Sequence, residues 1–89
     1  MEAVVSIDEF LKDQEIFLLD GKKEIAHQLT TLEDLPDVLY SLQSDYGFTD
    51  VMMAGAPTYC EGIANKIEEA RGKQYSNLPK LNFKYVQNV

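Results

Sequence analysis

The stretch that decides the fold is TDVMMAGAPTYCEGIANKIEEA, residues 49–70. It opens with an unbroken apolar run, Val51 to Ala54, which follows Asp50 and ends at Gly55. A short apolar run between turn residues is typical of a strand that is covered on both faces. Pro57 then holds the residue before it in extended geometry. The stretch therefore predicts a buried strand followed by a tight turn of small residues.

An amphipathic helix is predicted after this turn. Thr58 stands three residues before Glu61, which is the spacing of a capping box at a helix N-terminus. Gly72 follows the last apolar position and is a usual stop signal. Gly62 lies inside the helix at a cost of about 1 kcal/mol against Ala, and we attribute it to close packing on the strand. The apolar residues that share one helix face are Cys60, Ile63, Ala64, Ile67 and Ala70.

Two strands joined by a tight turn are predicted upstream, at residues 15–19 and 23–29. The dipeptide Asp20-Gly21 between them is a strong signal for a two-residue hairpin, because both turn positions favour positive φ. Such a turn would pair Ile16 with Ile25. The first strand is apolar on both faces, whereas the second alternates between apolar and polar residues.

A short helix is also predicted near the N-terminus. Ser6 and Glu9 have the spacing of a second capping box. The apolar residues that would line one side of this helix are Ile7, Phe10 and Leu11. We therefore interpret residues 1–14 as a helical segment in front of the sheet.

A longer helix is predicted after the hairpin, and a last strand is predicted near the end of the chain. Pro36 fits the first turn of this helix, and Gly47 follows its last apolar position. Alternating residues over 81–86 are typical of a strand with one covered face. We therefore expect residues 1–89 to form one small α/β domain, with the sheet and its helices in residues 15–86.

The predicted sheet is mixed and has four strands. The strands at 15–19 and 51–54 are apolar on both faces and belong in the middle, whereas those at 23–29 and 81–86 alternate and belong at the edges. Numbered along the chain, the expected order is 2-1-3-4. Right-handed crossovers put both long helices on one face. The short N-terminal helix either docks on the apolar centre of the other face or swings out, in which case the exposed patch would be an interaction surface that a symmetric dimer could bury.

The order hairpin, helix, strand, helix, strand resembles the later part of a ribonuclease H-like unit, the module repeated in actin-like ATPases. The run DVMMAGAPTYCEGIANKI is similar to the strand–Gly–Gly–loop–helix segment by which those ATPases hold adenosine. The resemblance covers residues 15–86 in topology. Ala54 stands at the first Gly of the pair, and no Gly-rich phosphate loop with an acidic residue occurs upstream. The resemblance therefore implies the fold and not ATP hydrolysis.

The net charge of −7 is unevenly distributed. Residues 1–65 hold 13 acidic and 3 basic side chains, whereas residues 66–89 hold 2 acidic and 5 basic ones. This balance argues against direct nucleic-acid binding, which needs Lys and Arg at the phosphates. An acidic surface is either simply solvated or attracts a basic protein partner. No apolar run approaches the ~20 residues of a membrane span, so we expect no membrane insertion.

Groups that could perform catalysis are few. Cys60 falls in a first helical turn, where a thiol pKa can be lowered, but it also lies on the apolar face. His27 lies on the far edge strand, so we interpret both side chains as structural. Asp20, Asp50 and Glu61 lack the spacing of a metal site, and we expect no metal, cofactor or catalytic residue. A single cysteine excludes an internal disulfide and fits the cytoplasm, where we expect the protein to act.

One turn could receive a ligand. Gly55, Ala56 and Thr58 stand at a helix N-terminus, where free N–H groups favour an anion. The first hypothesis is nevertheless a small acidic cytoplasmic protein-binding or regulatory domain without catalysis of its own. Its partner would be another protein or a second copy of the chain, which leaves a homodimer open. The alternative is a small-molecule or nucleotide-binding module that uses the Gly55–Thr58 turn.

Overall fold

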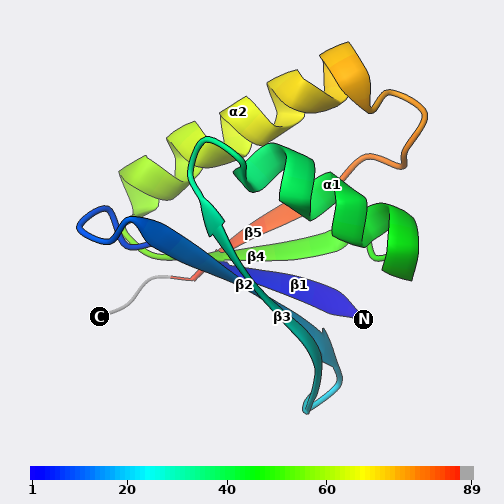
Figure 1. The fold of residues 1–89 in the computed structure, drawn as a ribbon, viewed down its shortest axis with the longest axis horizontal. Helices are drawn as coiled ribbons and strands as arrows, with labels where there is room; N and C mark the ends of the chain where they lie inside the picture. Colours follow the sequence, from blue (N-terminus) through cyan, green and yellow to red (C-terminus); the bar gives the residue numbers. More distant parts are fainter. Residues whose placement is uncertain (87–89) are drawn as a thin grey trace.

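The computed structural model describes residues 1–86 and shows a five-stranded sheet with two helices (Figure 1). The α/β class is as predicted. Along the chain, the elements are β1 (Glu2–Ser6), β2 (Asp13–Asp20), β3 (Lys23–Thr31), α1 (Leu35–Tyr46), β4 (Asp50–Ala54), α2 (Pro57–Gln74) and β5 (Asn82–Val86).

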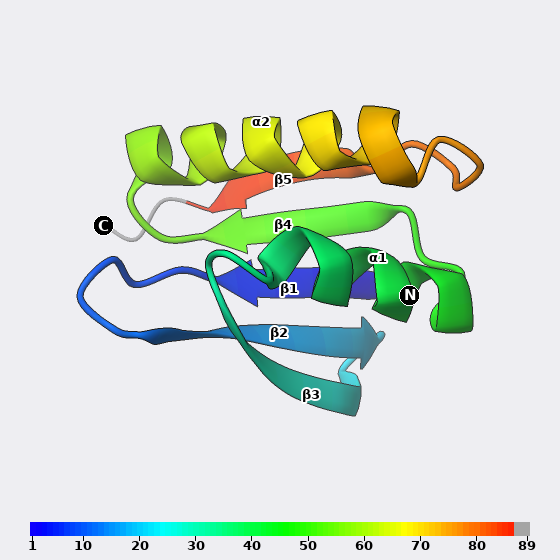
Figure 2. The same cartoon turned by 45° about the horizontal axis from the view of Figure 1, so that its top comes forward.

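The strands lie in the order β3-β2-β1-β4-β5 (Figure 2). β2 is antiparallel to both β1 and β3, and β4 is parallel to both β1 and β5. The four predicted strands keep their expected relative order. The prediction of a four-stranded sheet is wrong, because β1 is inserted between β2 and β4.

The predicted N-terminal helix is also wrong: β1 occupies residues 2–6 of the segment, and Ser6, the expected capping residue, is the last residue of this strand. Ala3 and Val5 are fully buried, and the residues on either side of each are partly exposed, which is the two-residue period of a strand. β1 pairs along its whole length with β2 on one side and β4 on the other. Two ladders of backbone hydrogen bonds outweigh one capping-box spacing, so the segment is extended.

The remainder of the predicted helix is a loop that the side chain of Gln14 holds in place. The Asp8 backbone N–H donates to Gln14 Oε1 over 2.6 Å, and Gln14 Nε2 donates to the carbonyl oxygens of Asp8 and Leu11, each over 2.9 Å. Phe10 is 89% exposed at the tip of this loop. The loop therefore does not cover the sheet face that the predicted helix would cover.

The hairpin between β2 and β3 turns one residue later than predicted. Its two turn residues are Gly21 and Lys22, and Gly21 has φ of 64°. No other residue of this turn has positive φ, as expected where glycine takes the first central position of a type II′ turn. The predicted register is wrong as well, because the later turn and a bulge between Leu18 and Leu19 together place Ile16 opposite Gln28.

The two helices depart from prediction mainly at the ends of α2. α1 ends at Gly47 as predicted, with φ of 80°. α2 begins at Pro57, because extended Ala56 already sets its start and Pro is preorganised for a first helical position. Thr58 makes no capping hydrogen bond, and the helix continues past Gly72 to Gln74. The predicted capping box and stop signal are therefore wrong.

Both helices pack on the same side of the sheet, and the core lies between them and the strands (Figure 1). None of the helices in residues 1–86 is long and apolar enough to cross a membrane. The central buried residues are Ala3, Val5, Ile16, Leu18, Leu35, Leu39, Val51, Met53, Ile63 and Ile67.

Candidate functional site

The turn predicted to receive a ligand is packed against the end of β1. Gly55 has φ of 150°, and a Cβ atom built there would lie 2.6 Å from the carbonyl oxygen of Ile7. The Ile7 backbone N–H donates to the Ala54 carbonyl oxygen over 2.8 Å in the same place. Close approach of two backbones therefore explains why glycine follows β4.

The hollow beside this turn is a poor place for an anion. It has a volume of about 360 Å³, and Ala56 and Pro57 line one of its sides. The acidic residues Asp8 and Glu9 also line it, and no Lys or Arg contributes to the lining. Thr58 is exposed outside this hollow. Binding of a nucleotide or another anion at Gly55, Ala56 and Thr58 stays a prediction, and these carboxylates oppose it.

Cys60 and His27 lie on opposite sides of the sheet. Cys60 is buried in α2 on the helix side, and burial raises the pKa of its thiol, which opposes formation of a nucleophilic thiolate. The His27 side chain is 42% exposed on β3, where its Nε2 lies 3.1 Å from Glu15 Oε1. The structure therefore does not form a catalytic pair from these two residues. In residues 1–86, no three His, Cys, Asp or Glu side chains converge as metal ligands.

The face of the sheet away from the helices carries a continuous row of side chains. Val4 of β1 lies opposite Phe17 of β2 and Met52 of β4. Phe17 in turn lies opposite His27, and their rings stack with centroids 4.4 Å apart. Met52 lies opposite Lys84 of β5. We call the surface around this row the open face, because no element in residues 1–86 covers it.

The open face has an apolar centre with three carboxylates beside it. Val4, Phe17 and Met52 are partly exposed, although each belongs to one of the three central strands. Carboxylates stand next to this centre on the same face. They belong to Glu2, Glu15 and Asp50, each two residues from a member of the row on its own strand. The positions on the other side of the same three residues are Ser6, Leu19 and Ala54, so the apolar patch has carboxylates along part of its border.

Sequence patterns identified only part of the open face. They indicated that the strands of Phe17 and Met52 are apolar on both faces, but they assigned Met52 to the core. They gave no role to Val4. The alternation of Glu2, Val4 and Ser6 with Ala3 and Val5 is the signal that could have located it.

No family model, no curated protein and no solved structure matches this chain. The resemblance to a ribonuclease H-like unit therefore rests on the order of elements alone. The elements in that order are the β2–β3 hairpin, α1, β4, α2 and β5.

Proposed function

We propose that this chain is a small protein-binding domain that uses the open face to hold a basic protein partner. The observation that carries the proposal is the uncovered row of Val4, Phe17 and Met52, bordered by carboxylates. Apolar side chains on central strands are normally covered, and uncovered patches of this kind mark interaction surfaces. The partner would place apolar side chains on the row and cationic ones beside the carboxylates.

Charge favours a basic partner over a second copy of the chain. The open face carries the carboxylates of Glu2, Glu15 and Asp50 against the single lysine Lys84, with His27 paired to Glu15. Two such faces would bring like charges together, and the chain as a whole has a net charge of −7. A partner rich in Lys and Arg would instead neutralise the border.

Size supports the same preference. β1, β4 and β5 have five paired residues each, whereas β2 and β3 have eight, so strands about 4.8 Å apart with about 3.3 Å per residue outline about 500 Å². That outline is smaller than the ~800 Å² that each partner contributes to a standard interface. A surface of this size suits reversible binding assisted by charge more than a permanent dimer. We place this activity in the cytoplasm, where the free thiol of Cys60 would stay reduced.

The test uses the chain as bait and two pairs of matched variants. A partner captured from cells is purified, and its affinity is measured for each variant. The apolar pair consists of two double variants. One combines Phe17→Thr and Met52→Thr on the open face, and the other combines Phe10→Thr and Leu11→Thr at the exposed loop tip. We expect the open-face variant to bind at least tenfold more weakly and the loop variant to bind normally.

The charge pair keeps the net charge equal in both variants. Glu2→Gln combined with Asp50→Asn changes the open face, whereas Glu68→Gln combined with Glu69→Gln changes exposed positions of α2. Only the first should weaken binding, and raising salt from about 0.01 M to about 1 M, which shortens the Debye length from about 30 Å to about 3 Å, should weaken it further. Equal affinity of all four variants for the partner would refute the proposal.

A further inference from the structure

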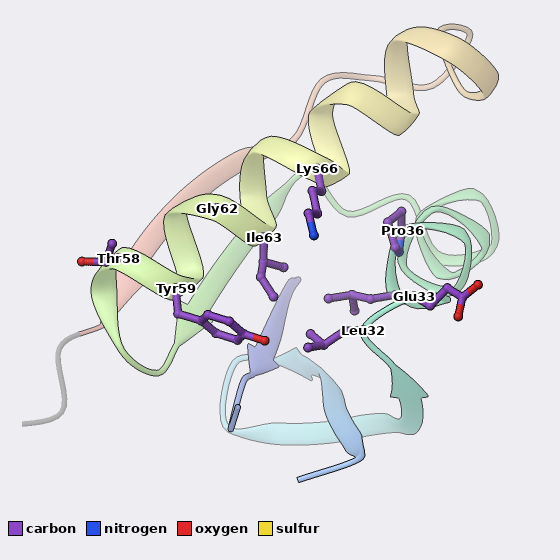
Figure 3. A pocket seen from close by; sticks show the side chains of 9 residues that line it. Leu32, Glu33, Pro36, Thr58, Tyr59, Gly62, Ile63 and Lys66 are labelled. Carbon is purple, nitrogen blue, oxygen red and sulfur yellow. The ribbon is translucent and has the colours of Figure 1, made fainter. Parts of the chain in front are cut away.

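A groove on the helix side of the molecule lies far from the open face. It runs between the segment that enters α1 and the first half of α2, and its volume is about 500 Å³ (Figure 3). This volume falls within the ~300–1,000 Å³ of small-molecule sites. The wall is mostly apolar, and its main contributors are Leu32, Leu35, Pro36, Tyr59 and Ile63.

Gly62 leaves one wall of this groove open. It lies inside α2, where glycine costs about 1 kcal/mol against Ala. A Cβ atom built at Gly62 would meet nothing within 4 Å, so close packing on the sheet, which the sequence analysis predicted, is not the reason for it. The fold itself does not require glycine here. A larger side chain at this position would instead occupy the groove.

Lys66 gives the groove a cationic end. It stands one helical turn after Gly62, and its ammonium group points into the groove in Figure 3. No carboxylate in residues 1–86 lies within 4 Å of this ammonium group, since His27–Glu15 is the one ion pair among them. The carboxylate of Glu33, at the rim, points away from Lys66 and Tyr59 in the same view. The lining of the groove thus combines apolar residues with two charged ones, Lys66 and Glu33, that form no ion pair with each other.

We propose that the groove binds a small amphipathic carboxylate, in which an apolar chain or ring carries a single carboxylate group. The carboxylate pairs with the Lys66 ammonium group, and the apolar part lies against Leu32, Ile63 and the ring of Tyr59. Charge complementarity selects an acid over an amine, and the missing side chain of Gly62 gives the apolar part its space. This site is independent of the open face and of any partner there.

Three probes of equal chain length test the proposal on the intact protein: octanoate, octanol and octylamine. Titrations followed by amide NMR should show octanoate shifting signals of residues 32–35 and 58–66. We expect octanol to bind at least tenfold more weakly, because it lacks the charge. Tighter binding of octylamine than of octanoate, or no shift of these signals with octanoate, would overturn the proposal.

Variants separate the groove from general charge effects. Gly62→Leu fills the groove with a good helix former and should abolish octanoate binding while the protein remains folded. Lys66→Met should weaken octanoate binding at least tenfold and leave octanol binding unchanged. Lys73→Met makes the same charge change in the same helix outside this groove and should bind octanoate normally. Equal losses in the two lysine variants, or normal octanoate binding by Gly62→Leu, would contradict the assignment.

Discussion

At the scale of single residues, two glycines in neighbouring elements have opposite surroundings. Gly55 has no room for a side chain, because its Cβ atom would lie 2.6 Å from the Ile7 carbonyl oxygen and 3.1 Å from Cys60 Sγ. We expect Gly55→Ala to lower the free energy of unfolding by roughly 3 kcal/mol, as backbone strain and overpacking combine. Gly62→Ala, with an open surround, should raise it by about 0.5–1 kcal/mol. Urea unfolding of both variants measures this difference. An unchanged free energy of unfolding in Gly55→Ala would contradict the prediction.

The buried hydroxyl group of Tyr40 should make the free energy of unfolding depend on pH in the alkaline range. It is buried and donates to the Ile67 carbonyl oxygen over 3.0 Å, and burial, opposed by Arg71, raises the Tyr40 pKa to about 12. An unfolded tyrosine loses its proton near pH 10, so the folded state keeps the proton over a range in which the unfolded state has released it. The free energy of unfolding should therefore be unaffected below about pH 10 and fall by up to roughly 3 kcal/mol as pH rises to about 12.

Tyr40→Phe tests this origin of the alkaline loss. At neutral pH the variant should lower the free energy of unfolding by about 1 kcal/mol, because it loses a hydrogen bond. It should also remove most of the decrease in this free energy between pH 10 and 12. Part of the fall should remain, because a hydrogen bond to Asp37 raises the pKa of Tyr75 and burial raises that of Tyr85. Tyr46→Phe, at an exposed position, should leave the whole fall in place. Identical pH profiles for the two variants would rule out the assignment to Tyr40.

At the scale of elements, the sequence predicted the parts whose signals are local and missed the part that depends on distant pairing. The apolar run of β4, the spacing of α2 and the glycine after α1 all lie within their own segments, and these elements were predicted. β1 lacks the unbroken apolar run of β4 and the turn signals that bound it, and its partners begin at Asp13 and Asp50. A local capping spacing at Ser6 therefore favoured a helix that the two distant ladders exclude.

The loop after β1 provides a test at the same scale, because one buried side chain holds three of its backbone groups. Gln14→Leu would leave the Asp8 N–H and the Asp8 and Leu11 carbonyl oxygens without these partners. We expect a loss of roughly 2–3 kcal/mol in chemical unfolding and faster amide exchange across residues 8–12. Phe10→Asp is the control and should change stability by less than about 0.5 kcal/mol, since Phe10 is 89% exposed. A loss near 3 kcal/mol in Phe10→Asp would mean that the loop docks on the sheet.

At the scale of the whole molecule, the candidate site was predictable only as an uncovered area. Strands that are apolar on both faces implied a second apolar face, and Phe17 of β2 and Met52 of β4 are partly exposed there. Which residues form that face depends on β1, because Val4 joins Phe17 to Met52. The groove beside α2 could not be read from the sequence either, since helical spacing alone does not tell a packed glycine from an open one.

The open face also allows a prediction about the mass of the protein in solution. Light scattering should give a constant 10.1 kDa over a wide range of protein concentration at low salt, because a second copy would oppose the net charge of −7 with its own. High salt screens this repulsion but does not weaken apolar contacts through Val4, Phe17 and Met52. Any self-association should therefore appear first at high salt. In that case Phe17→Thr should restore the monomer mass, whereas Phe10→Thr should not. A doubled mass already at low salt would instead make a second copy the occupant of the open face, in an interface with two-fold symmetry.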